Sequence, residues 1–436
     1  MFTVRFASGR RAAGTAMLAA AIGLAGSLTA GAALAAPPKV EDVLTTYGDI
    51  AHAGYADSLA TAQALDRAID RLIATPTEDS LKAARAAWLA ARVPYQQTEV
   101  YRFGNAIVDD WEGRVNAWPL DEGLIDYVDA GYGSESDVNR FYAVNVIANP
   151  KLRVGGETLD TAIITPALLQ DVLQEAGGVE ANVATGYHAI EFLLWGQDLN
   201  GTGPGAGARP ATDYSRTACT GGNCERRAAY LKAASTLLIG DLQEMAAKWD
   251  KGGEARLALY EAGPQGGLAT MLTGMGSLSY GELAGERMKL GLLLHDPEEE
   301  HDCFSDNTHN SHYYDALGIR NVYLGSYRRP DGSTVEGASL SALVKATDAG
   351  LDAEMRRKLD ATVAAMQAMR DRADRGEAYD QMIGGGNDAG NAVVQAAIDA
   401  LVAQTRTIER IVPALGLQEI AVEGSDSLDN PNAVFQ

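Results

Sequence analysis

Apolar residues recur at helical spacing along most of the chain, and this periodicity limits the possible fold more than any other feature. From residue 40 to residue 73, apolar side chains return every three or four positions, as they do on a helix with one buried face. Alanine is abundant, and alternating runs of β-branched residues are scarce. Thr-Pro steps at Thr75 and Thr165 are typical helix starts, with the threonine as N-cap. We therefore predict an all-α protein.

The same periodicity predicts further helices at 75–103, 224–249, 266–294, 339–373 and 387–412. The many glycines of 266–294 cost helix stability, which indicates close helix packing there. Between them, residues 197–223 are rich in Gly, Pro, Asn and Ser, which is typical of a long loop. We predict an N-terminal helical bundle at 36–205 and a C-terminal one at 206–436. Their similar plans suggest an old duplication, with a site between the two bundles.

Residues 1–35 have the features of an export signal. Arg5, Arg10 and Arg11 form a basic start, an apolar run follows, and residues 33–35 offer a small-x-small cleavage site. The run is too short to indicate a transmembrane span. We predict a periplasmic protein, with association with the outer membrane left open.

The charge of the chain bears on its partners. The formal net charge is −22 at pH 7, which argues against binding to nucleic acid or to anionic lipid. Such a surface suits cations, although it often serves solubility alone. The chain has three cysteines. Cys219 and Cys224 flank a turn-like Thr-Gly-Gly-Asn stretch and are candidates for a small disulfide loop, which would leave Cys303 over.

The stretch from Gly186 to Gly196 is typical of a short helix that is apolar nearly all round, which predicts burial. Its His188 and Glu191 are three positions apart and share one face. A buried carboxylate has to be paired. Two interpretations stay open: a structural hydrogen bond inside the core, or a metal site. The zinc-peptidase motif His-Glu-x-x-His is absent, and His-x-x-Glu-His is incomplete because Phe192 replaces its second histidine.

A polar stripe lies on the helix predicted to reach residue 103. Arg92, Gln96, Glu99 and Arg102 fall on one face of it. This face is either solvated or turned towards the buried space of His188. In the second case Glu99 is a third metal ligand, and Arg92 or Arg102 could hold an anion such as citrate.

Residues 296–326 are unusually rich in acids and histidines. Four of the six histidines lie in or beside this stretch, at positions 295, 301, 309 and 312. Glu298 and His301 have the Glu-x-x-His spacing of di-iron bundles, in a single copy. We interpret the stretch as a surface or helix-capping cluster, with metal binding as the alternative.

The helix that carries the polar pair resembles the imelysin family. Gly186, His188 and Glu191 match the family's Gly-x-His-x-x-Glu signature. Other segments are similar to the family as well: residues 101–104, 118–119, 125–127, 193–198, 208–210 and 213–214. Residues 285–288 and 300–309 are similar to its iron-regulated branch. The similarity covers nearly the whole chain after residue 35.

This resemblance implies a two-domain, all-helical fold with the signature helix near the domain interface. It implies one of two functions. The first is an exported protein that binds iron, or else zinc or another divalent metal, for uptake or storage. His188 and Glu191 would be ligands, with Glu99 added from its helix face. Its partners would be the metal ion or a metal chelate and an iron-uptake component of the membrane. The second is a metallopeptidase of the insulin-cleaving imelysin type. The missing second histidine favours binding.

Overall fold

Long helices carry the fold, which confirms the predicted all-α class. The computed structural model describes residues 36–154 and 156–435, and the predicted export signal at 1–35 lies outside them. The long helices are α1 (Val40–Ala74), α2 (Glu78–Gln96), α5 (Gly186–Trp195), α6 (Cys224–Lys248), α8 (Gly263–Ser277), α10 (Thr308–Leu324), α12 (Ala349–Ala373) and α14 (Asp388–Ala414).

Shorter elements connect these helices. The short helices are α3 (Ala106–Glu112), α4 (Pro166–Leu168), α7 (Glu254–Glu261), α9 (Leu290–Leu294), α11 (Leu340–Thr347), α13 (Tyr379–Ile383) and α15 (Asp426–Asp429). A π-helical segment, η7 (Leu278–Lys289), joins α8 to α9. Two small antiparallel hairpins pair β1 (Lys151–Val154) with β2 (Glu157–Asp160) and β3 (Ser326–Arg328) with β4 (Thr334–Glu336).

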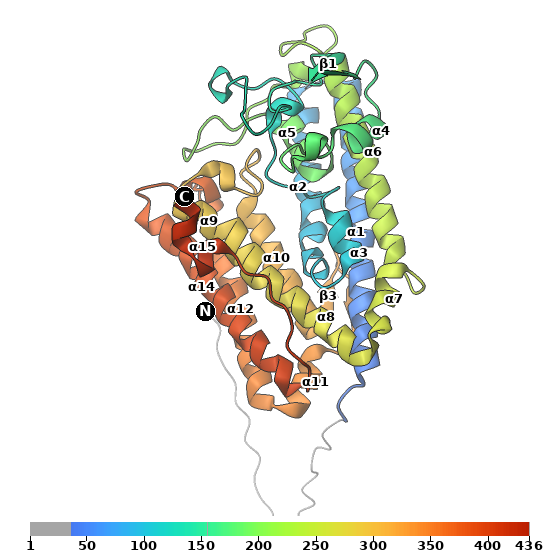
Figure 1. Ribbon diagram of the computed structural model, residues 1–436, viewed down its shortest axis with the longest axis vertical. Coiled ribbons are helices and arrows are strands. Elements are labelled where there is room, and N and C mark those ends of the chain that lie inside the picture. Colours follow the sequence, from blue (N-terminus) through green and yellow to red (C-terminus); the bar gives the residue numbers. More distant parts are fainter. Residues whose placement is uncertain (1–35, 155, 436) are drawn as a thin grey trace, which may run out of the picture. The chain divides into compact units, whose positions relative to one another are not determined.

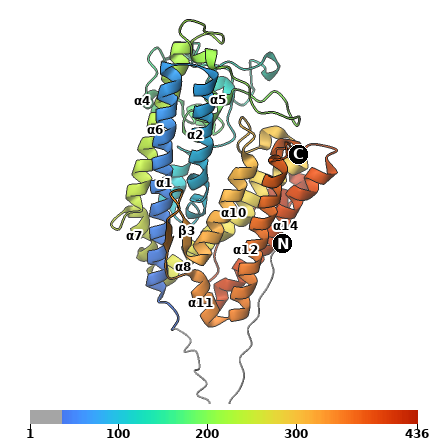
Figure 2. The same cartoon turned by 180° about the vertical axis from the view of Figure 1, so that it is seen from behind.

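The helices pack in two groups. Helices α1, α2, α5 and α6 pack along one another, and α10, α11, α12 and α14 form the other group together with η7 (Figure 1). Helix α10 also packs against α2, and α8 packs against α1 and α14, so the two groups share an interface (Figure 2). Helix α6 follows the boundary predicted after residue 205, yet it packs on α1. The division at that boundary and the duplication stay predictions.

Two helix ends differ from the sequence prediction. Helix α2 has Thr77 as its N-cap, whose hydroxyl accepts from Ser80 N–H, because Thr75 instead ends α1 by donating its N–H to Arg71. Helix α2 also ends at Gln96 rather than near residue 103. Pro94 lies inside its last turn, where a proline removes a backbone donor and crowds the preceding turn. Residues Glu99–Tyr101 then form a separate 3-10 turn, η1.

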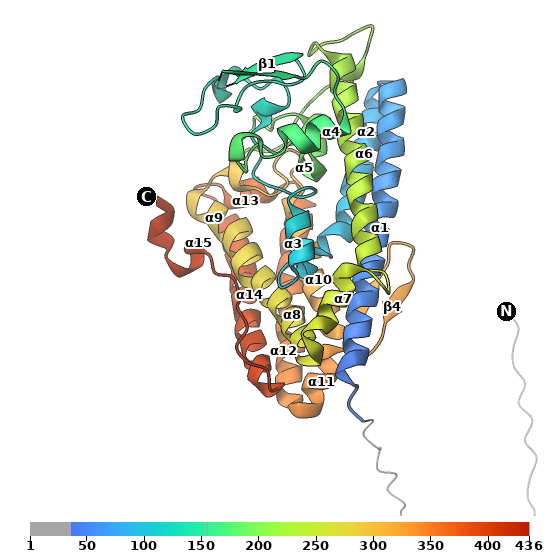
Figure 3. The same ribbon diagram turned by 45° about the vertical axis from the view of Figure 1, so that its right-hand side comes forward.

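Glycines in α8 and η7 permit close packing, as their density predicts. A Cβ at Gly274 would collide with the carbonyl oxygen of Val100. Along the same helical run, the segment after α14 lies against further glycines, with Val422 beside Gly276 and Glu423 beside Gly281 (Figure 3). The C-terminal segment is thereby packed onto this run.

The apolar core extends through both helix groups as one cluster. At one end the rings of Tyr47, Tyr101 and Trp249 pack together, with centroids 4.7 to 5.9 Å apart. Among the described residues, no helix combines the length and the apolar character needed to cross a bilayer.

Candidate metal centre

Gly186 begins α5 at a point where a side chain does not fit. Its φ is +78°, in the left-handed region that favours glycine. A Cβ there would collide with the backbone of Val115, and Tyr187 N–H donates to the carbonyl oxygen of Val115 at 2.8 Å. All ten residues of α5 are buried. The glycine therefore lets the start of α5 pack directly against the backbone at Val115, and His188 is buried as a result.

The two polar partners on α5 leave one nitrogen free. His188 Nδ1 and Glu191 Oε2 lie 2.9 Å apart and share a hydrogen bond. Glu191 Oε1 accepts from the backbone N–H and the hydroxyl of Ser305, at 3.0 and 2.6 Å. His188 Nε2 is buried and has no hydrogen-bond partner among the described residues. Glu191 thus orients the imidazole, and Nε2 is the atom left to bind a ligand.

Burial keeps the imidazole of His188 neutral. The side chain is 2% exposed, and burial together with the positive charge of Arg92 lowers its pKa to about 3. Burial and the charge of Asp302 raise the pKa of Glu191 well above its usual range. In the tautomer in which Nδ1 donates its proton to Glu191, the neutral imidazole has its lone pair on Nε2, as a metal ion requires.

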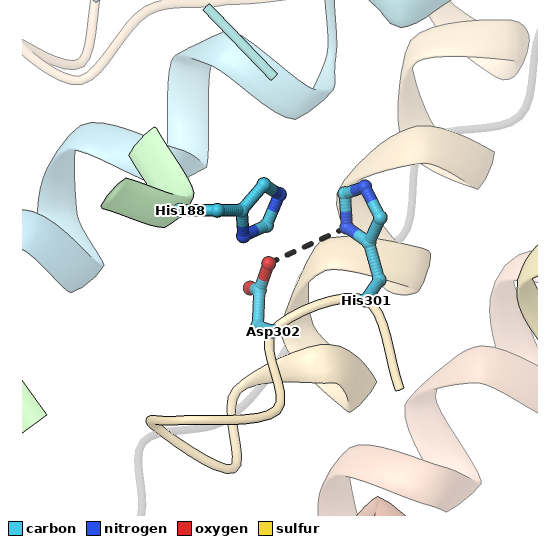
Figure 4. A group of neighbouring side chains, drawn as sticks. All are labelled: His188, His301 and Asp302. Atoms are coloured by element: carbon cyan, nitrogen blue, oxygen red, sulfur yellow. Dashed lines mark ion pairs between the residues drawn. The ribbon is translucent and has the colours of Figure 1, made fainter. Parts of the chain in front are cut away.

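Two further side chains meet His188 from the segment between η8 (Pro297–Glu299) and α10. His188, His301 and Asp302 each place one potential ligand atom within 4.8 Å of the others (Figure 4). The two imidazole rings meet edge to face, with centroids 4.8 Å apart. His301 Nδ1 is 3.3 Å from Asp302 Oδ1, and burial lowers the pKa of His301 well below its usual range. Two imidazoles and a carboxylate suit iron, zinc and similar metals.

Arg92, on α2, fixes the charge and position of Asp302. Its Nη2 donates to Asp302 Oδ1 at 2.7 Å, and its Nη1 donates to Asn116 at 2.6 Å. Burial alone would raise the pKa of Asp302, but Arg92 and His301 hold it well below its usual range. Asn307 Nδ2 donates to the second carboxylate oxygen at 2.8 Å. An ionised carboxylate therefore lies beside the two imidazoles.

Glu99 lies in a neighbouring network rather than in this group. Its Oε2 accepts from Arg287 Nη2 at 2.6 Å, and Arg287 also pairs with Glu282 and Asp315. Glu99 is 2% exposed and Arg92 is 1% exposed, so this part of the polar stripe is buried, not solvated. As a metal ligand Glu99 stays a prediction: like Asp302 it is paired with a guanidinium, but it lies outside the group formed by His188, His301 and Asp302. Glu191 as a direct ligand also stays a prediction.

Two cavities reach the group, and Trp118 and Pro119 line both. The first, of about 460 Å³, is lined by His188 and by Asp121, Glu122, Glu298 and Glu299. The second, of about 640 Å³, is lined by His301, by Arg102 and Arg287, and by the acids Asp109, Asp110, Glu112, Glu175, Glu180, Glu282, Glu286 and Glu299. Because carboxylates outnumber arginines in these linings, the cavities attract cations.

The core of the histidine-rich stretch is buried, so its interpretation as a surface or capping cluster is wrong there. His301, His309 and His312 are 1%, 8% and 0% exposed. A segment with so many charged residues, considered alone, is predicted to be exposed to solvent. In the structure Arg92 pairs with Asp302 and Glu191 bonds to Ser305, and these contacts hold the segment between α2 and α5. The high density of histidines was the one sequence signal that pointed to a site here. No local sequence feature indicated that these residues lie beside His188.

A disulfide and a buried ionic group lie at the start of α6. Cys219 and Cys224 are joined in a disulfide, and Cys303 is free. Beside the disulfide loop, Arg209 pairs with both Asp126 and Asp213, at 2.8 and 3.1 Å. Arg227 pairs with Asp126 at 2.6 Å. We call Asp126, Asp213, Arg209 and Arg227 the arginine-paired group.

Comparisons with known proteins agree on one family and one fold. The sequence model described as Imelysin matches residues 51–408. The iron-regulated protein A of Synechococcus elongatus is 37% identical over 67 residues, which are 15% of this chain and 19% of that protein, so the match spans about a fifth of that relative. A crystal structure of a provisionally assigned iron-regulated protein A precursor from Parabacteroides distasonis has a TM-score of 0.60 and 19% identity, over 87% of this chain and 96% of that chain. At that identity the likeness establishes the fold.

Proposed function

This chain belongs to the imelysin family, and on that premise we propose that it is an exported, periplasmic protein that binds iron for uptake. His188, His301 and Asp302 are the proposed ligands. The observation that carries this proposal is the buried Nε2 of His188, which has no partner among the described residues. Leaving a buried polar atom unpaired costs free energy, and a metal ion at this atom would recover it. Glu191 on Nδ1 is the carboxylate that commonly orients a metal-binding histidine.

Iron is favoured over zinc by the relatives rather than by the donor atoms. Both similar proteins are named as iron-regulated, whereas two imidazoles and a carboxylate suit either metal. A bound ion would supply positive charge beside Asp302 and keep coordination positions open to water. Zinc or another divalent metal is therefore the alternative cargo.

Charge around the site favours a bare cation over an anionic chelate such as citrate. Arg92 is committed to Asp302 and Asn116. Arg102 lies within 4.0 Å of Asp109, Glu112 and Glu282. The basic, then apolar, start of the chain supports export, and an iron-uptake component of the membrane is the proposed partner.

Metal titration of the purified chain tests the proposal. We expect ferrous iron to bind the wild type, and the double variant His188→Ala with His301→Ala to lose affinity by about 100-fold or more. The matched control is His52→Ala, a partly buried histidine of α1 that does not belong to the proposed ligand group, and it should bind iron as the wild type does. Equal, weak binding by wild type and double variant would mean that the group is structural. Tight binding of zinc with no binding of iron would show that the bound metal is zinc, while the proposed ligands would remain the same.

A peptidase activity is the second candidate, because the family includes peptidases and a cavity of about 460 Å³ adjoins His188. A metallopeptidase of this type would use a metal-bound water and a general base, and Glu191 is the carboxylate of the family's signature motif that could serve as that base. Both oxygens of Glu191 are engaged, by His188 and by Ser305, so we expect no cleavage of a denatured peptide by the metal-loaded protein. Cleavage that disappears in Glu191→Gln would reverse the order of the two candidates.

A further inference from the structure

Three carboxylates meet beside the metal centre without a positive partner. Glu300, Asp306 and Asp380 each offer one oxygen, and these oxygens lie within 4.8 Å of one another. Glu300 and Asp380 are each 1% exposed. Among the described residues, Glu300 Oε1, Asp306 Oδ1 and both carboxylate oxygens of Asp380 are buried with no hydrogen-bond partner. We call these three residues the unpaired carboxylate group.

Such a group is costly unless a positive charge enters it. Isolated buried carboxylates lose hydration, and like charges repel one another. Burial and the neighbouring acids Asp380 and Asp198 raise the pKa of Asp306 to about 7. For Asp380, burial raises the pKa to about 6 even though the N–H groups of Asp380 and Gln381 act in the opposite direction. These N–H groups do not complete a hydrogen bond to the carboxylate. Nothing within the described chain therefore satisfies these oxygens.

The backbone presents this group and the metal centre from one segment. Glu300 and Asp306 contribute to the carboxylate group, while His301 and Asp302, between them, contribute to the metal centre. Ser305 bonds to Glu191. The chain turns at Asp306, whose φ of +54° is left-handed, and Asp380 completes the group from α13.

We propose that Glu300, Asp306 and Asp380 form a second cation site, made of oxygen ligands and suited to a hard divalent ion, with calcium as the best fit. The group contains no nitrogen or sulfur donor, and carboxylate oxygens with water are what calcium and magnesium prefer. Oxygens within 4.8 Å of one another can share an ion at the calcium–oxygen distance of about 2.4 Å. Magnesium demands stricter octahedral geometry, so calcium should bind more tightly. This site does not rest on the proposed iron function.

The test is calcium binding by the full chain after removal of metals with a chelator. Calorimetric titration with calcium chloride should show one site with a dissociation constant of about 1 mM or below, and calcium should raise the melting temperature. Asp380→Asn should weaken binding by about 10-fold or more and reduce the rise in melting temperature. Glu300→Gln is the second variant, in case the first folds poorly. Asp137→Asn, at an exposed position, is the matched control and should bind calcium as the wild type does.

Two results separate this site from the iron centre. His188→Ala, on α5 and outside the segment that carries Glu300 and Asp306, should bind calcium as the Asp137→Asn control does while it loses iron. Conversely, Asp380→Asn should keep most of its iron affinity. No calcium binding by the wild type at about 10 mM, well above the usual range for such sites, would overturn the proposal and mean that the carboxyls are held by protons. Equal calcium binding by wild type, Asp380→Asn and Glu300→Gln would also overturn it.

Discussion

The arginine-paired group and the unpaired carboxylate group bury similar numbers of acids and treat them in opposite ways. In the first, Arg209 and Arg227 reach Asp126 and Asp213 at 2.6 to 3.1 Å. In the second, no cation of the described chain reaches Glu300, Asp306 or Asp380. Burial alone therefore does not distinguish a structural acid from a ligand. What separates these two groups is whether an arginine of the described chain reaches the acids.

The pKa values of the acids differ between the two groups in the way that the presence or absence of arginine predicts. Burial would raise the pKa of Asp213, but Tyr127 and Arg227 bring it below its usual range. For Asp306, burial and its acidic neighbours act together and raise the pKa to about 7. The candidate metal centre lies between these extremes, since Arg92 pairs with Asp302 while Nε2 of His188 has no partner among the described residues. One substitution, Asp→Asn, can be made in each setting and should give a different result in each.

The largest effect is expected at Asp126. Asp126→Asn leaves Arg209 and Arg227 buried without their shared counter-ion, and breaking such a pair costs about 3–5 kcal/mol of the free energy of unfolding. Urea unfolding of wild type and variant measures this loss. Asp137→Asn, the same change at an exposed position, should stay within about 0.5 kcal/mol of the wild type. A loss below about 1 kcal/mol for Asp126→Asn would erase the contrast between the two groups.

The next effect concerns metal affinity rather than folding. Asp302→Asn replaces a proposed anionic ligand by a neutral amide, and iron affinity should fall by about 100-fold. Competition against a coloured chelator measures the affinity, and circular dichroism checks that the variant folds. Unchanged affinity in a folded variant would remove Asp302 from the ligand set.

At Asp380 the same kind of substitution should stabilise the protein instead of destabilising it. Without divalent ions, Asp380→Asn removes one of three crowded carboxylates and should raise the melting temperature by roughly 1–3 °C. With calcium present, the wild type should become the more stable of the two. A variant that melts lower than the wild type in the absence of metal would show that Asp380 has a partner within the chain.

The smallest effect is a pH dependence of the stability that involves Asp241. Here an arginine lies beside the carboxyl, but burial has the larger influence on its pKa. Arg114 lies 3.2 Å from Asp241, yet burial raises the pKa of this carboxyl to about 6. Because the folded state binds this proton more tightly than the unfolded state, the stability that it contributes is present at low pH and lost as the pH rises through about 6.

Urea unfolding at pH about 4.5 and about 7 should show this trend in the wild type and less of it in Asp241→Asn. An identical pH dependence in both proteins would mean that Arg114 offsets the burial of Asp241 in full.

Local sequence was sufficient for the helices and for the pair on α5. The periodicity of α1, α6 and α14 predicted the all-α class, because each helix has one apolar face that must be buried, and the structure confirms it. The Gly-x-His-x-x-Glu segment indicated a buried helix with two polar residues on one face, and the structure has it so. Helix ends were less predictable, because Thr75 and Thr77 carry the same local signal and tertiary context selects between them.

The composition of the candidate metal centre could not be derived from local sequence. His301 and Asp302 lie far from His188 along the chain, and their surroundings are rich in charge. Only the packing of α2 and α5 shows that these charges are paired with Arg92 and turned inward. For Glu99 the alternative of a buried helix face is correct. Its carboxylate, however, pairs with Arg287, whose position depends on the packing of η7.

The arrangement of residues 300–306 also restricts how this protein can change during evolution. Single substitutions there affect one group at a time, because Glu300 and Asp306 contribute to one group and His301 and Asp302 to the other. A residue inserted or deleted between Glu300 and Asp306 shifts the register and moves members of both groups at once. The length of this segment is therefore expected to tolerate less variation than its composition, and the two groups would be inherited, or lost, together.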